Sequence, residues 1–104
     1  MSHILVITTF SEKEDAKKFG ELVIKKELGA CVQILGPIES IYSWNDKVGD
    51  SEEYICFIKT KKDLYEELEE LILEIHPYET PELIAVDIVE GSEEYLDWIN
   101  HVTS

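Results

Sequence analysis

The order of hydrophobic and polar positions divides this chain into short strands and amphipathic helices. Residues 4–9 (ILVITT) form an apolar, β-branched run without alternation, which is typical of a central strand covered on both faces. Ser11 and Glu14 then have the spacing of a capping box, and Gly29 is a typical helix stop. A helix is therefore expected to begin after Ser11 and to end before Gly29. The stripe that this helix would bury contains Ala16, Phe19, Val23 and Leu28.

A long hairpin is expected next. Residues 31–44 have the composition of a strand, but Gly36-Pro37 interrupts it, and a bend or bulge is predicted there. The segment 45–50 (NDKVGD) is rich in turn-forming residues, and residues 53–60 are apolar again. This pattern predicts two antiparallel strands joined by a turn over residues 45–50.

Two further helices flank a last strand. Residues 63–75 place leucine and isoleucine at helical spacing with glutamate between them, and Pro77 ends the helix. Residues 83–89 predict a strand, and residues 92–102 predict a final helix. The order βαββαβ plus a terminal helix, with right-handed crossovers, predicts one α+β domain over residues 1–104. Its expected fold is ferredoxin-like, an antiparallel sheet with helices on one face.

The predicted hairpin is too long for a compact subunit. An extended run over residues 31–44 would measure about 45 Å at about 3.3 Å per residue. A globule of this chain length has a diameter of only about 30–35 Å. The tip should therefore overhang, and its apolar side chains are costly to leave in water: Ile41, Tyr42, Trp44, Val48 and Tyr54. We infer a homo-oligomer joined through this hairpin; the alternative is a hairpin that curls over its own core.

Charge then limits the partners. The chain has a formal net charge of −14, and its nine basic residues are all lysine. Residues 1–62 are nearly balanced at −1, whereas residues 63–104 carry 13 acids and no lysine. Such a surface repels nucleic acid and anionic membranes, so neither is expected as a partner. No apolar run approaches the roughly 18 residues of a membrane span, and the first residues lack the features of a signal peptide. A cytosolic location is therefore expected, in which Cys31 and Cys56 stay free thiols.

The most distinctive segment is residues 76–82 (HPYETPE). Its two prolines stiffen a loop that presents the side chains of His76, Tyr78, Glu79 and Glu82. Imidazole and carboxylate together suit copper, zinc or nickel, so His76, Glu79 and Glu82 are candidate metal ligands. The alternative for His76 is structural, because an imidazole at the end of a helix caps its last carbonyls and complements its dipole.

Lys59 is a second candidate functional residue. Alternation places it on the same strand face as Ile55 and Phe57, where a half-buried ammonium needs a carboxylate such as that of Glu79 or Glu82. The alternative is an ammonium that reaches water at the strand end. The aromatic residues expected in the core or in a subunit interface are Tyr42, Trp44, Tyr78 and Trp98. No nucleotide, nucleophile or metalloprotease motif is present, so an enzyme is not expected.

Several of these segments together carry a resemblance. They are residues 30–33 (ACVQ), 40–44 (SIYSW), 59–60 (KT), 76–82 (HPYETPE) and 95–99 (YLDWI). In this order and spacing they resemble the CutA family of divalent-cation tolerance proteins. The resemblance implies a ferredoxin-like subunit in a tight homotrimer, similar to that of the PII signalling proteins, whose hairpins lock neighbouring subunits together. It also implies an association with tolerance of copper and other divalent ions.

The resemblance implies functional residues as well. Those thought to gather at clefts between subunits match Tyr42, Trp44, Lys59, Tyr78 and Trp98, with His76, Glu79 and Glu82. Some copper-binding members use a Cys at the end of the first strand and an extra His before the loop motif. Thr8 and Ile75 stand at those places here, which leaves Glu82, with His76, as the implied ligands. At the hairpin tip, Ser43, Asn45 and Asp46 also depart from the family pattern.

The leading hypothesis is therefore a homotrimeric cytosolic protein that binds Cu²⁺ or another divalent metal ion in metal-ion homeostasis, with no organic cofactor. The alternative is a PII-like regulator that binds a small anionic metabolite at clefts between subunits, with Lys59 as the charge partner. An enzyme that uses His76 with Glu79 or Glu82 as acid and base ranks last, because no nucleophile accompanies them.

Overall fold

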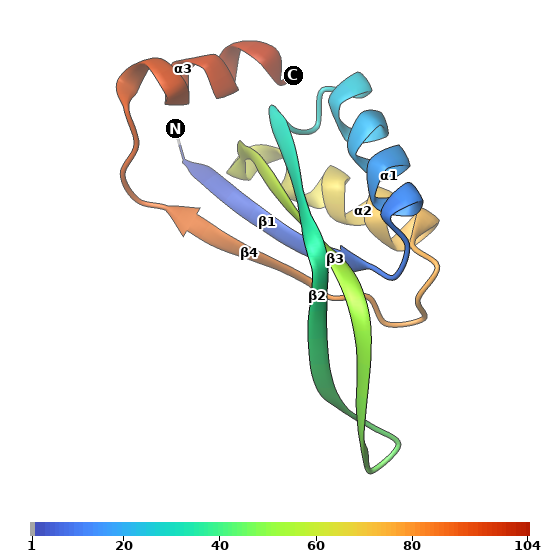
Figure 1. Ribbon diagram of the computed structural model, residues 1–104. Helices are drawn as coiled ribbons and strands as arrows, with labels where there is room; N and C mark the ends of the chain where they lie inside the picture. Colours follow the sequence, from blue (N-terminus) through green and yellow to red (C-terminus); the bar gives the residue numbers. More distant parts are fainter. Residues whose placement is uncertain (1) are drawn as a thin grey trace.

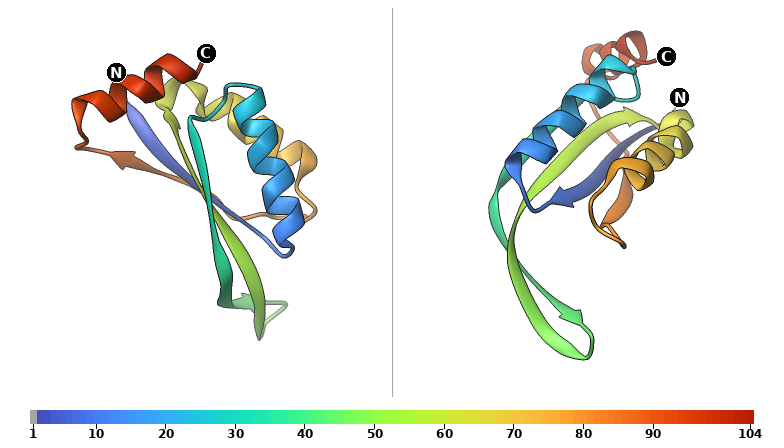
Figure 2. Two further views of the ribbon diagram at one scale, coloured as in Figure 1. Left: turned by 45° about the horizontal axis from the view of Figure 1, so that its top comes forward. Right: turned by 90° about the vertical axis from the view of Figure 1, so that its right-hand side faces the viewer.

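A computed structural model describes residues 2–104. The elements along the chain are β1 (His3–Phe10), α1 (Lys13–Lys25), β2 (Cys31–Trp44), β3 (Lys47–Lys61), the 3-10 turn η1 (Lys62–Leu64), α2 (Tyr65–Ile75), β4 (Leu83–Ile88) and α3 (Glu93–Val102). The sheet has the order β2-β3-β1-β4, and all neighbouring strands are antiparallel. Figures 1 and 2 show α1 and α2 on one face of this sheet. The predicted ferredoxin-like α+β fold is confirmed.

The core lies between the sheet and these two helices. Register places Val6 opposite Ile58, and both side chains are fully buried beneath the helices. The apolar faces predicted for the helices form the other side of this core. Phe19 on α1 and Leu68 on α2 are among their buried residues. α3 instead lies across the end of the sheet, where Ile99 is fully buried (Figure 1). None of the described helices is long and apolar enough to cross a membrane.

The helix boundaries differ from the prediction at α1 and α2. The capping box at Ser11 does not form, because α1 starts at Lys13 with Glu12 as its N-cap and without a side-chain cap. Gly29 does not stop the helix either: α1 ends at Lys25, and Glu27 takes a left-handed φ of 59°. Gly29 instead permits close packing, since a Cβ there would lie 2.7 Å from Ile58 Cγ2. At α2 the predicted start at residue 63 falls in η1.

The hairpin is longer than the pattern of turn residues indicated. Only Asn45 and Asp46 form the turn, with φ values of 51° and 62°, and β3 already begins at Lys47. Two such left-handed residues match the twist of a two-residue hairpin, so the expected six-residue turn was wrong. The predicted irregularity at Gly36-Pro37 is confirmed as a register shift between Leu35 and Ile38.

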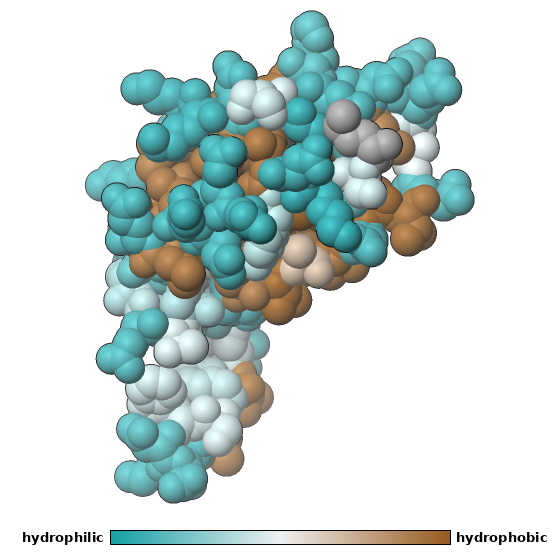
Figure 3. Space-filling model, turned by 180° about the vertical axis from the view of Figure 1, so that it is seen from behind, coloured by the Kyte–Doolittle hydropathy of each residue, from teal (hydrophilic) through white to brown (hydrophobic). Residues whose placement is uncertain are grey.

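The hairpin overhangs the rest of the subunit, as its length predicted. The chain measures 45 × 25 × 22 Å, and Figures 1 and 2 show the β2–β3 tip extending well beyond the helices. Apolar side chains are exposed on both faces of the tip, with Trp44 59% and Val48 84% exposed. Figure 3 shows hydrophobic atoms at its surface. Tyr54, expected at the tip, packs instead against the core.

A second apolar surface lies on the outer face of the sheet, the face turned away from α1 and α2. Register brings Ile7, Phe57 and Ile84 side by side on this face. Ile84 and the neighbouring Val86 are about half exposed. This outer face and the hairpin tip are the surfaces that an assembly would cover.

Candidate functional site

The loop between α2 and β4 is fastened to the end of β1 by His76. The backbone N–H of His76 caps α2 by donating to the Ile72 carbonyl. Its Nε2 lies 2.6 Å from the Thr9 carbonyl oxygen, and its Nδ1 lies 3.1 Å from the backbone nitrogen of Tyr78. The ring also stacks on Phe10, with the centroids 4.3 Å apart.

These two contacts define the protonation of His76. A carbonyl only accepts, so Nε2 carries the hydrogen, and the Tyr78 N–H only donates, so Nδ1 carries the lone pair. Burial of the ring lowers the pKa of His76, against smaller opposing effects of the Thr9 hydrogen bond and of Glu53 and Asp15. His76 is therefore a neutral structural residue within this subunit. Neither nitrogen is free to bind a metal ion or to transfer a proton.

The loop delivers Tyr78 to a buried carboxylate, Glu53, which sequence reasoning did not single out. Glu53 is only 9% exposed, and its Oε2 accepts from the Tyr78 hydroxyl at 2.9 Å and from Thr9 Oγ1 at 3.3 Å. Burial, followed by the hydrogen bond to Glu53, raises the pKa of Tyr78 to about 12. Tyr78 is thus a neutral donor that holds Glu53 in place at neutral pH.

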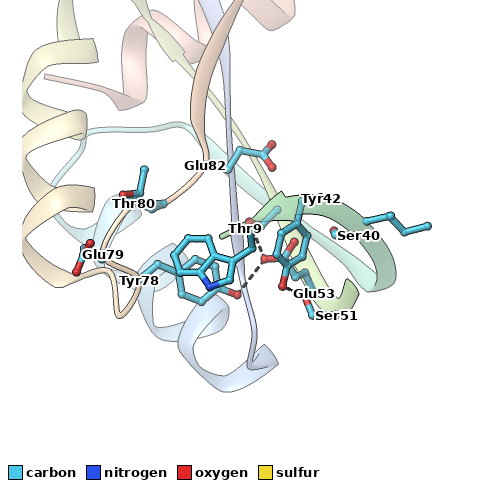
Figure 4. A pocket seen from close by; sticks show the side chains of 12 residues that line it. Thr9, Ser40, Tyr42, Ser51, Glu53, Tyr78, Glu79, Thr80 and Glu82 are labelled. Atoms are coloured by element: carbon cyan, nitrogen blue, oxygen red, sulfur yellow. Dashed lines mark hydrogen bonds between the residues drawn. The ribbon is translucent and has the colours of Figure 1, made fainter. Parts of the chain in front are cut away.

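Glu53 lines a cavity of about 890 Å³ between the β2–β3 hairpin and the loop 76–82. The cavity is lined by Thr9, Ser40, Ile41, Tyr42, Trp44, Ser51, Glu53, Tyr78, Glu79, Thr80, Pro81 and Glu82. Figure 4 shows Tyr42 and Tyr78 on either side of Glu53, with Glu82 beyond them. The described lining contains three carboxylates and no lysine, arginine or histidine. An electrostatic preference for cations follows from this lining.

Glu82 and Glu79 belong to this cavity, but His76 does not line it. Partial burial, and then the charge of Glu53, raise the pKa of the Glu82 carboxyl group. Glu79 and Glu82 are both exposed in the single chain. Within residues 2–104, no group of three or more His, Cys, Asp or Glu side chains is arranged to hold a metal ion. The predicted ligands His76, Glu79 and Glu82 therefore form no complete site within the described chain.

The remaining candidate residues separate into two groups. Tyr42 and Trp44 line the cavity with Tyr78, whereas Lys59 and Trp98 lie at the other end of the outer face. The Lys59 ammonium is 5.7 Å from the centre of the Tyr95 ring, and Trp98 lies beside the same ring. Lys59 follows Glu53 by six residues on β3, a distance of roughly 20 Å. Lys59 therefore does not reach the carboxylates of its own cavity.

The two cysteines are free, as expected. Cys56 is fully buried in the core, and burial raises the pKa of its thiol to about 11. Cys31 is only partly covered. Neither thiol lines the cavity.

The fold and the site together define a class of protein. Its members have a ferredoxin-like fold, a protruding hairpin and an acidic cavity lined by aromatic residues. The sequence model of the CutA1 divalent ion tolerance protein family matches residues 4–102. The chain belongs to this family, and the predicted resemblance is confirmed.

Individual relatives support the same conclusion. "Protein CutA, chloroplastic" of Arabidopsis thaliana is 39% identical over 100 residues, which are 96% of this chain and 55% of that protein. "Divalent-cation tolerance protein CutA" of Thermus thermophilus is 36% identical over 103 residues, 99% of each chain. The crystal structure of CutA1 from Oryza sativa matches with a TM-score of 0.97 at 36% identity, covering 100% of this chain and 95% of that one. The chain thus spans about half the length of the Arabidopsis relative, and none of these names specifies a reaction.

Proposed function

We propose that this protein is a homotrimeric, cytosolic member of its family that binds copper or another divalent metal ion and acts in metal-ion homeostasis. The observation that carries the proposal is the cavity, where Glu53 and Glu82 face a space whose described lining contains no cation. Carboxylates that line one cavity repel each other, and a bound cation relieves this repulsion. A divalent cation would supply the missing charge.

The chemistry of the lining bears on which metal ion binds. Since both nitrogens of His76 have partners in the chain, the available donors are oxygens of carboxylates, hydroxyls and phenols. Such ligands suit Mn²⁺ or Mg²⁺ as well as Cu²⁺. We therefore assign the first ligand to Glu82, with Glu79 and groups from a neighbouring subunit completing the site.

The trimer is proposed because the chain exposes two apolar surfaces that assembly would bury. The hairpin tip exposes Val48 and Trp44 on opposite faces, and the outer face of the sheet exposes Ile84 and Val86. A closed ring of subunits can bury a tip between neighbours and bring outer faces together. Sedimentation should give three times the chain mass of 12.0 kDa, and Val48→Glu should lower it. A wild-type monomer would contradict the proposal.

The anionic-metabolite alternative is disfavoured at this cavity, because its three carboxylates repel an anion. Lys59, the proposed partner of such an anion, lies at the other end of the outer face. A cytosolic location remains part of the proposal and can be tested by cell fractionation.

Titration calorimetry with Cu²⁺, Zn²⁺ and Mn²⁺ tests the metal proposal. A trimer would carry three times the chain charge of −14 and would accumulate cations nonspecifically. The titration therefore needs about 0.15 M salt, where the screening length is about 8 Å. We expect saturable binding that Glu82→Ala abolishes and that Glu90→Ala, an exposed change of equal charge, preserves. Absence of saturable binding by all three ions would refute the metal proposal.

A further inference from the structure

The carboxylate of Glu53 is only half satisfied by its own chain. Oε2 accepts both hydrogen bonds, from Tyr78 and Thr9, whereas Oε1 has no hydrogen-bond donor among the described residues. The residue is nine-tenths buried, so its remaining surface faces the cavity that it lines. Glu53 therefore presents one free oxygen and a negative charge to whatever occupies this space.

The walls around that oxygen are aromatic. Tyr42 and Tyr78 lie on either side of Glu53 in Figure 4, and Trp44 is a further lining residue. The faces of aromatic rings carry negative charge density and attract organic cations, with tryptophan as the best partner. A buried carboxylate that shares a cavity with aromatic side chains can recognise an ammonium or guanidinium group.

The size of the cavity also favours an organic ligand. A metal ion uses only a small part of a cavity of about 890 Å³, and ligand pockets in this range typically enclose organic molecules. The hydroxyls of Ser40 and Ser51 add polar groups on the hairpin side. An organic cation could place its charge at Glu53 and its carbon chain against the aromatic side chains.

We propose that this cavity binds the ammonium or guanidinium group of an organic cation, with Glu53 as its charge partner and Tyr42, Trp44 and Tyr78 as its walls. This site goes beyond the proposed metal binding, which is assigned to Glu82. The cation has two sources, a free small molecule or the Lys59 side chain of a second copy of this chain. The subunit's own Lys59 is excluded, since it lies roughly 20 Å along β3.

The test is calorimetric titration with putrescine and agmatine at about 0.15 M salt. EDTA is present, so that the outcome is independent of metal binding at Glu82. Butane-1,4-diol, which has the carbon body of putrescine without its charge, serves as the neutral control. We expect saturable binding of at least one cation and none of the diol. Glu53→Gln should weaken this binding by about 10- to 100-fold, as expected for a hydrogen-bonded charge.

Two control variants make the result specific. Glu52→Gln makes the same charge change on the neighbouring residue, which faces away from the cavity, and should leave binding unchanged. If Glu53→Gln does not fold, Tyr42→Ala in the cavity wall should weaken binding by about 2- to 30-fold.

The source of the cation is decided by Lys59→Ala. Binding to the wild type supports a free ligand. Binding that appears only in Lys59→Ala supports the same site with the lysine of a second copy as its resident cation. No binding to either protein, or binding that Glu53→Gln and Tyr42→Ala leave unchanged, would overturn the proposal.

Discussion

Replacement of His76 by alanine tests the role that the structure gives to this residue. His76 is 8% exposed and joins three parts of the molecule: the end of α2, the Thr9 carbonyl on β1 and the backbone of Tyr78. The substitution should destabilise the fold and release the loop 76–82 from β1. A surface metal ligand, by contrast, could be removed with little effect on stability.

The magnitude follows from the contacts that are lost. The Thr9 carbonyl would be left buried without its donor, at a cost of about 1–3 kcal/mol. Loss of stacking on Phe10 adds about 0.5–1.5 kcal/mol. Together these give an expected loss of about 1.5–4.5 kcal/mol in the free energy of unfolding of His76→Ala. The matched control His101→Ala, at an exposed position near the end of α3, should change it by less than about 0.5 kcal/mol.

The effect of pH has a definite sign. The folded-state pKa of His76 is lowered, so between that pKa and about 6.5 the unfolded chain binds a proton that the folded chain does not. Stability from neutral His76 is present above about pH 6.5 and is lost as the pH falls through this window. The raised pKa of Glu82 acts in the opposite direction, since it favours the folded state at lower pH. His76→Ala also releases the loop that carries Glu82, so the comparison is made in a Glu82→Ala background, where the difference between the pH profiles with and without His76 isolates His76.

Urea unfolding, followed by circular dichroism, measures both effects. It is done at one fixed protein concentration, because the stability of a protein that self-associates depends on its concentration. The reasoning is refuted if His76→Ala costs less than about 1 kcal/mol, or if the two proteins show the same pH dependence between about pH 5 and 8.

Three further perturbations test the packing around the site. Tyr78→Phe removes a hydrogen bond to a buried charge and should cost about 1.5–3 kcal/mol in urea unfolding; a cost near zero would show that Glu53 does not depend on this donor. Gly29→Ala places a Cβ 2.7 Å from Ile58 Cγ2 in the core and should cost about 1–3 kcal/mol, whereas unchanged stability would contradict the close approach. The Cys56 thiol should react with a thiol reagent only on unfolding, because burial excludes the reagent and raises the thiol pKa to about 11; rapid reaction in the folded protein would contradict its burial.

The fold could be predicted where local patterns carry the information. The period of the apolar residues located both major helices, and the length of residues 31–44 predicted the overhanging hairpin. Helix ends were less predictable, because Ser11 offers a capping side chain that the chain does not use. The turn was misplaced because Asn45 and Asp46 alone supply the left-handed conformations that reverse the chain, which leaves the next polar residues free to continue β3.

The site was predictable only in part, because it is made by segments distant in the sequence. The loop 76–82 was identified from its residue types, but the role of His76 depends on Thr9 and Phe10, more than 60 residues earlier. Glu53 was missed since an acid at the start of a strand usually faces water. One feature of the sequence could have identified Glu53. Alternation along β3 places it on the same face as Ile55, and it is the only acidic residue of β3 on that face. Its hydrogen bond to Tyr78 joins positions 25 residues apart in the sequence, which no local pattern brings together.

Anomalous diffraction from crystals grown with Cu²⁺ at about 0.15 M salt would test the divalent-cation proposal most directly. We predict three copies of the chain around a three-fold axis, with an anomalous peak at bonding distance from Glu82 in each cavity and with His76 still bonded to Thr9 and Tyr78. Copper only on the exposed glutamates of α2, or no ordered copper at all, would contradict the proposed function.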